Sequence, residues 1–353
     1  MEDVYEKLRK RLDDMAAGYP VTKSGVEIKI LKRLFTEEEA ELFLEFPTPW
    51  FLETPDDAAK RLNRDPVETA EQMKQMAQKG LLFRSRKGDQ VRYAAVPYIV
   101  GIFEFQLNSL DPEIAHDMEE YFESAIGPTL QSFQTPVMRT IPINRQLVAE
   151  WPIAPYEDVM KILEDQKTIG ISPCICRKIS QQVDKGCDKP LEVCFQFGAI
   201  ASYYVDNGLG RYISLEEAKK IVKESEEAGL VMQPFNSQKV TAMCCCCGDC
   251  CAALRSLKMQ PNPAAAVKSN YFSKVIEDEC DGCESCIERC QMEAIEMVDE
   301  IATVNLDRCI GCGLCVSACP TEAIRLVKKP DDEQYIPPKT GVETNVRIEQ
   351  ARK

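Results

Sequence analysis

Eight of the eighteen cysteines in this 353-residue chain stand near the C-terminus, in two runs of identical spacing. Each run has three cysteines at intervals of three residues and a fourth cysteine four residues later. The first run contains Cys280, Cys283, Cys286 and Cys290, and the second contains Cys309, Cys312, Cys315 and Cys319. The segments 293–295 and 322–324, both Glu-Ala-Ile, repeat at the same offset of 29 residues. This internal repeat indicates a small module built from two similar halves.

The rest of the chain decides whether these thiols form disulfides or bind metal. Residues 1–6 are charged and polar, unlike a secretory signal peptide. The longest apolar stretch, 93–103, is too short to span a bilayer and contains a proline and a glycine. We therefore expect a cytoplasmic protein without membrane insertion, in which reduced cysteines serve as metal ligands. Because His116 is the only histidine, thiolate remains as the soft ligand, and soft thiolates select zinc or iron–sulfur clusters.

The spacing within each run favours an iron–sulfur cubane over zinc. Three thiols at intervals of three wrap a tight loop and converge on three irons, so the fourth iron needs a thiol from elsewhere. Zinc would require two Cys-x-x-Cys pairs instead of runs of three and one. A purely structural role usually needs one cluster, whereas two neighbouring clusters suit electron transfer. The two runs therefore predict two [4Fe-4S] clusters.

The doubled motif resembles the bacterial-type two-cluster [4Fe-4S] ferredoxins over about residues 269–329. The resemblance implies that the fourth cysteine of each run crosses to the other cluster. Cluster 1 would then be held by Cys280, Cys283, Cys286 and Cys319. Cluster 2 would be held by Cys309, Cys312, Cys315 and Cys290. The chain departs from the pattern after the fourth cysteine of the first run. Gln291 follows Cys290, whereas Pro320 follows Cys319 in the second run, so the turn after Cys290 is expected to differ.

Ten further cysteines lie within about 80 residues of the middle of the chain, too many for packing alone. They form two groups, Cys174, Cys176, Cys187 and Cys194 in one, and Cys244 to Cys247, Cys250 and Cys251 in the other. Cys244-x-x-Cys247-x-x-Cys250 has the spacing of a cubane loop, but Cys247-x-x-Cys250 alone also suits zinc or a dithiol. Adjacent cysteines point in different directions, so either two metals are bound or some thiols are structural. An additional Fe–S cluster, zinc and metal-free thiols all remain open.

Residues 150–325 also resemble poorly characterised multi-cysteine 4Fe-4S proteins of anaerobes. Their Pro-Cys-x-Cys-Arg motif is matched by Pro173, Cys174, Cys176 and Arg177. Their Cys-x-Cys-Cys-Gly-x-Cys-Cys motif is matched by Cys244, Cys246, Cys247, Gly248, Cys250 and Cys251. The resemblance implies a further metal centre and makes Cys245 the least essential cysteine. The candidate ligands are Cys174, Cys176, Cys187, Cys194, Cys244, Cys246, Cys247, Cys250 and Cys251.

The segment 36–97 has the pattern of three helices followed by a short hairpin and resembles a winged helix. Thr36, Thr54 and Asp65 each stand where a helix N-cap is expected. The third helix, 67–79, has two acidic and two basic residues and therefore lacks the charge that DNA readers need, although the following wing is basic. We favour a docking or dimerisation domain, with DNA binding as the alternative.

These patterns predict an α+β multidomain chain. The expected parts are a helical extension (1–35), the winged-helix-like domain (36–97), a helical connector and linker (98–155), a cysteine-rich α/β region (156–260), the ferredoxin fold (269–329) and a polar tail (330–353) that is mobile or lies over the surface.

The predicted function is electron transfer through two [4Fe-4S] clusters, which relay single electrons to a further cysteine-ligated centre. One alternative is an oxidoreductase that reduces a small substrate or a disulfide at the second cysteine set. The other is a redox-responsive winged-helix regulator. Redox proteins are the expected partners, nucleic acid is disfavoured by the net charge of −14, and the winged-helix-like domain could form an oligomer. No catalytic residue stands out in the sequence.

Overall fold

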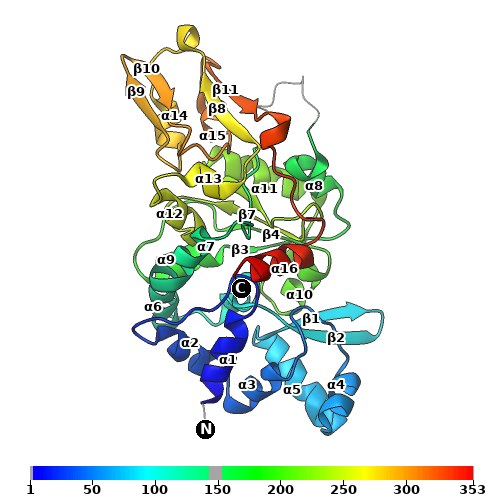
Figure 1. Ribbon diagram of the computed structural model, residues 1–353. Helices are drawn as coiled ribbons and strands as arrows, with labels where there is room; N and C mark the ends of the chain where they lie inside the picture. Colours follow the sequence, from blue (N-terminus) through cyan, green and yellow to red (C-terminus); the bar gives the residue numbers. More distant parts are fainter. Residues whose placement is uncertain (1–2, 143–152, 353) are drawn as a thin grey trace.

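The computed structural model describes residues 3–142 and 153–352 (Figure 1). Helices of the N-terminal half occupy one end of the molecule, a five-stranded sheet lies in the middle, and the doubled cysteine module lies at the other end. The second cysteine set is therefore sandwiched between the N-terminal helices and the ferredoxin-like module.

The N-terminal helices begin where the sequence predicts. Helices α1 to α5 span Val4–Asp13, Val26–Leu34, Glu37–Leu44, Pro55–Leu62 and Pro66–Gln78, and strands β1 (Leu82–Lys87) and β2 (Gln90–Ala95) form the hairpin. Thr36 forms a capping box with Glu39, and Asp65 accepts hydrogen bonds from two N–H groups of α5. Met73 and Met76 are fully buried, as expected for core residues. The three helices and hairpin are thus confirmed, while the winged-helix assignment stays a prediction.

The connector after the hairpin is only partly regular. Its elements are η1 (Tyr98–Ile102), η2 (Glu104–Asn108), α6 (Pro112–Tyr121), η3 (Phe122–Ile126) and α7 (Gly127–Gln131). Ile99, Val100 and Gly101 have non-helical dihedral angles, so the helical pattern is interrupted there. His116 is exposed on α6, in line with the role of a solvated residue. The predicted linker 142–155 falls mostly outside the described residues.

An antiparallel sheet carries the second cysteine set. Strands β3 (Ile169–Pro173), β4 (Glu192–Phe197), β5 (Arg211–Ile213), β6 (Val231–Pro234) and β7 (Ala242–Cys246) lie in the order β5-β3-β4-β7-β6. One side packs on α8 (Val159–Glu164), which follows η5 (Pro155–Glu157), and on α11 (Leu215–Glu227). Helices α9 (Ile175–Gln182) and α10 (Ala199–Asp206) join the core of the N-terminal half, and α12 is Ala252–Lys258.

The ferredoxin-like module keeps its internal repeat in three dimensions. It contains α13 (Pro263–Val267), β8 (Tyr271–Val275), η6 (Glu277–Glu279), α14 (Ser285–Arg289), β9 (Ile295–Val298), β10 (Ile301–Val304), α15 (Leu314–Ala318) and β11 (Ile324–Lys328). Strand β8 pairs with β11 and β9 with β10, both antiparallel. Gly282 and Gly311, at equivalent positions, both have positive φ. A side chain at Gly311 would meet the Tyr271 carbonyl oxygen at 2.1 Å, so the second loop requires glycine.

The C-terminal segment, expected to be a polar tail that is mobile or lies over the surface, contains a docked helix. After η7 (Asp331–Glu333) it forms helix α16 (Gly341–Arg352), which runs back to the N-terminal helices (Figure 1). The Arg352 guanidinium pairs with the Asp13 carboxylate at 2.7 Å, and Glu349 accepts a hydrogen bond from the Ala16 N–H. Thr344 and Ile348, four residues apart, are buried on one face of the helix. The helix therefore docks through the buried Ile348, through Thr344, whose hydroxyl donates to the Asn236 carbonyl oxygen, and through these polar contacts to the N-terminal segment.

We predict that Ile348→Ala destabilises the protein by about 2–5 kcal/mol, because the substitution leaves a cavity in the core shared with α1 and α2. Val346→Ala is the matched control on the same helix. Val346 is 42% exposed, so its truncation should change the free energy of unfolding by no more than about 0.5 kcal/mol. Urea unfolding followed by circular dichroism measures both. Equal effects of the two substitutions would contradict the docking of α16.

Candidate metal centres

Two small cavities in the ferredoxin-like module are each lined by four cysteines. Cys280, Cys283, Cys286 and Cys319 line one cavity. Cys290, Cys309, Cys312 and Cys315 line the other. Each cavity therefore receives three thiols from one run and the fourth from the other run, the grouping that the resemblance implies. The assignment of these residues to individual clusters stays a prediction.

The surroundings of the second of these cavities favour metal-bound thiolates. The Ala294 N–H donates to Cys290 Sγ at 3.2 Å and the Ser273 N–H donates to Cys309 Sγ at 3.4 Å. Such donors stabilise negative charge on sulfur and tune a cluster. Burial raises the pKa of Cys315 to about 12, so a bare thiolate is disfavoured at this position. A bound cation removes that penalty, and the donor set therefore fits an iron–sulfur cluster.

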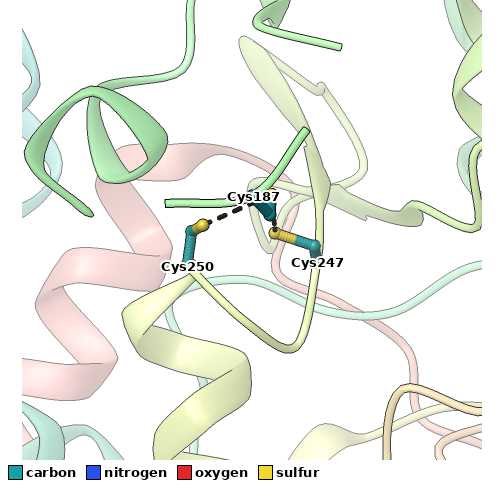
Figure 2. Close-up of side chains that lie close together, drawn as sticks. All are labelled: Cys187, Cys247 and Cys250. Atoms are coloured by element: carbon teal, nitrogen blue, oxygen red, sulfur yellow. Dashed lines mark hydrogen bonds between the residues drawn. The ribbon is translucent and has the colours of Figure 1, made fainter. Parts of the chain in front are cut away.

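Three thiols of the second cysteine set converge on one point, which we call the three-thiol site (Figure 2). Cys187 Sγ lies 3.8 Å from Cys247 Sγ and 3.4 Å from Cys250 Sγ. All three sulfurs lie within 4.8 Å of one another. A tetrahedral zinc ion with Zn–S bonds of about 2.3 Å holds its thiolates about 3.8 Å apart. The spacing thus fits a single ion.

The other six candidate ligands line a separate cavity, and we call them the six-thiol group. They are Cys174, Cys176, Cys194, Cys244, Cys246 and Cys251. Sheet register brings Cys194 on β4 opposite Cys244 on β7, and Cys246 follows on the same face of β7. The space they line is about 140 Å³, against about 20 Å³ and 10 Å³ for the two ferredoxin cavities by the same measure. This cavity therefore has room for more than a single ion.

Hydrogen bonds connect the six thiols in a row, so lowered and raised pKa values alternate along it. Bonds received from neighbouring thiols lower the pKa of Cys174, Cys244 and Cys251. Bonds donated to those neighbours raise the pKa of Cys176, Cys194 and Cys246. Cys174, Cys244 and Cys251 are therefore the members of the group that more readily carry the negative charge of a metal-bound thiolate.

A buried arginine lies between the two sets of thiols. Arg177 is 1% exposed and donates to the carbonyl oxygens of Pro190 and Cys245. Burial opposes its charge, but the thiols of Cys174 and Cys247 outweigh burial and raise the pKa of Arg177. Cys174 belongs to the six-thiol group and Cys247 to the three-thiol site, so one guanidinium stabilises thiolates in both.

The remaining cysteine of the set, Cys245, points to the other face of β7. Its thiol donates to the Met232 sulfur at 3.4 Å, and burial raises its pKa to about 12. It lines neither of the thiol sites. The structure thus gathers the nine predicted ligands into groups of three and six. The spacing of the cysteines in the sequence did not predict this division.

The six-thiol group and one ferredoxin cavity share an apolar cluster. Its buried members include Cys246 and Cys251 from the first and Ile310 and Leu314 from the second, and Cys290 packs against it. Gln291, which departs from the ferredoxin pattern, adds a polar connection. Its Oε1 accepts a 2.6 Å hydrogen bond from the Gly248 N–H, between Cys247 and Cys250. The unusual residue therefore joins the module to the second cysteine set.

Sequence reasoning missed a large cavity beside the six-thiol group. It measures about 490 Å³ and shares Val100, Glu104, Met138, Cys194 and Cys244 with the thiol-lined space. Burial raises the pKa of Glu104 to about 8, although the Gly101 N–H donates to its carboxylate at 2.7 Å. The lining comes from separate elements spread along the chain, so no local motif pointed to it.

Two of the basic residues of the hairpin form ion pairs within the protein. Arg84 and Arg86 both lie within 3.5 Å of the Asp206 carboxylate. On the preceding helix, Lys74 pairs with Glu71 and Lys79 with Glu39. The positive charge that kept DNA binding open is therefore partly neutralised by carboxylates.

Comparison with known proteins gives one match. The family described as 4Fe-4S binding domain matches residues 302–325, which include the whole second cysteine run. The chain thus contains a ferredoxin-type domain that binds at least one 4Fe-4S cluster. Searches among curated proteins and among solved structures found no match. Among the described residues, no helix has the length and apolar character required to cross a membrane.

We predict that Gln291→Leu lowers the free energy of unfolding by about 1–3 kcal/mol, because it leaves the buried Gly248 N–H without an acceptor. Gln291→Glu keeps an acceptor oxygen at this position and should lose less stability. Urea unfolding of the anaerobically prepared protein tests the pair. If Gln291→Leu is as stable as the unmodified protein, the hydrogen bond does not hold the module to the cysteine loop.

Proposed function

We propose that this chain is an iron–sulfur electron-transfer protein with two [4Fe-4S] clusters in its ferredoxin-type domain and a further cysteine-ligated centre in the middle domain. The observation that carries the proposal is the pair of four-thiol cavities in crossed arrangement, one of which shares an apolar cluster with the six-thiol group. Bound [4Fe-4S] clusters supply reversible one-electron chemistry.

The residues around the two cavities suggest which cavity faces a redox partner and which faces the second cysteine set. Cys283 is exposed, and acidic residues such as Asp281 and Glu284 line its cavity. This end suits a redox partner that presents a positive patch. At the other cavity Cys315 is buried, and Cys290 packs toward the six-thiol group. The exposed cavity would then face the partner and the buried cavity would face the middle domain.

The two thiol sets of the middle domain suit different metals. The three-thiol site has the sulfur spacing of a single zinc ion, with three protein ligands. The six-thiol group lines a larger space and offers more thiols than one ion can bind, which suits a further iron–sulfur cluster. In both, Arg177 stabilises the thiolates.

Anaerobically purified protein is expected to contain about eight or more iron atoms per chain, with matching sulfide. Iron and sulfide analysis tests this, and far fewer than eight irons would falsify the two-cluster carrier.

The crossed ligation gives a sharper test. By electron paramagnetic resonance, Cys290→Ser should alter the same cluster signal as Cys312→Ser, and Cys319→Ser the same signal as Cys283→Ser. Pairing within each run instead would show that no crossing occurs.

Elemental analysis of two variants tests the three-thiol site. Cys187→Ser is expected to lose about one zinc ion per chain, because it removes a ligand that contacts both other thiols. Cys245→Ser is the control, since its sulfur contacts Met232 and lies outside the site. Unchanged zinc content in Cys187→Ser, or an equal loss in Cys245→Ser, would show that the three-thiol site does not bind the zinc ion.

A second candidate function, reduction of a small molecule at the six-thiol group, is favoured by the 490 Å³ cavity beside Cys194 and Cys244. Cavities of a few hundred Å³ are typical of small-molecule sites. The redox-responsive regulator has no comparable support, because Arg84 and Arg86 of the wing are paired with Asp206.

A further inference from the structure

Six aromatic side chains from distant parts of the chain contribute to the lining of the large cavity. They are Trp50, Phe83, Phe105, Phe197, Tyr204 and Phe235. Helix α16 contributes Gly341 and Val342 to its wall. Planar aromatic walls favour a ligand that carries a ring, since stacked or edge-to-face contacts add to the gain from apolar burial.

Two polar atoms of the lining have no hydrogen-bond partner. Gln196 is 1% exposed, and its Nε2 donates to the Cys194 carbonyl and to Ser172 Oγ, which leaves Oε1 without a donor. The Trp50 indole Nε1 is also buried and unpaired. Unpaired buried polar atoms are costly, and a ligand that offers both a donor and an acceptor would satisfy them.

Backbone strain also marks Trp50. Its φ is +62°, in the left-handed region that bulky residues rarely adopt. The strained residue holds an aromatic ring with an unpaired N–H against the cavity. Such strain is common at binding sites, where the surrounding structure compensates for it.

The charged groups of the lining are Glu104 and Lys239. Glu104 lies where the cavity meets the six-thiol group and accepts a hydrogen bond from the Gly101 N–H. Among the described residues, Lys239 is the one cation of the lining, and because it is exposed it belongs to the solvent-accessible part of the site. A ligand with an apolar body and one carboxylate would place the carboxylate at Lys239.

We propose that this cavity is the binding site for a small aryl carboxylate that carries a hydroxyl or amino group. The ring would lie among the aromatic side chains, the acid at Lys239 and the hydroxyl or amino group at Gln196. Cys194 and Cys244 form part of the same wall, so the bound ring would lie against the six-thiol group. Any role of the ligand as a redox substrate rests on the proposed function, but its binding does not.

Isothermal titration calorimetry with 6-hydroxy-2-naphthoate, on the full chain prepared anaerobically, tests the proposal. Ala199 on α10 and Val342 on α16 are exposed residues of the lining, so Ala199→Phe and Val342→Trp should obstruct the open side of the cavity and each weaken binding at least about tenfold. Ala265→Phe, at an exposed alanine of α13 outside the cavity, is the matched control and should bind normally.

The carboxylate is tested separately with Lys239→Met. This variant should bind 6-hydroxy-2-naphthoate about threefold to fivefold more weakly, as expected for an exposed ion pair, and should bind 2-naphthol unchanged. No binding at about 1 mM ligand, or binding that neither filling substitution affects, overturns the site. If Lys239→Met weakens the binding of both ligands equally, the ligand's carboxylate does not lie at Lys239. Binding by protein with few irons would reject the electron carrier and leave the site intact.

Discussion

Burial of thiolate charge is the constraint on which this structure depends. The five-stranded sheet and its adjoining loops place nine thiols around two points in the interior, and ionised sulfur there is costly without a compensating cation. Arg177 supplies one positive charge between the two sets, and it cannot neutralise nine sulfurs. Metal ions supply the rest in the proposed function, so the strands and loops around Arg177 are expected to reach full stability only with metal bound.

The ferredoxin-like module is an integral part of this arrangement. Arg308 donates to the carbonyl oxygens of Met292, Gln260 and Lys258, and Lys258 pairs with Glu293. Together with Gln291 and the shared apolar cluster, these contacts fix one thiol-lined cavity against the other domain. A free ferredoxin exchanges electrons by collision, whereas this module has a permanent neighbour on one side.

Local signals in the sequence were sufficient for the helices and hairpin of the N-terminal half, and insufficient for the way the parts assemble. Thr36 and Asp65 cap their helices as predicted, because capping depends on the next three residues. The division of the nine thiols depends on the register of β4 against β7 and on a loop that carries Cys187 back to Cys250, which are long-range features. The docking of α16 rests on Thr344 and Ile348, and a single buried aliphatic residue does not stand out in a polar segment.

The position of α16 has a consequence for how the protein is made. Residues of this last helix close one wall of the aromatic cavity and pair with Asp13 near the start of the chain. During synthesis the N-terminal half and the cysteine-rich sheet leave the ribosome before the helix that covers them exists. Until α16 has been synthesised and has docked, the aromatic cavity therefore lacks the wall that Gly341 and Val342 supply.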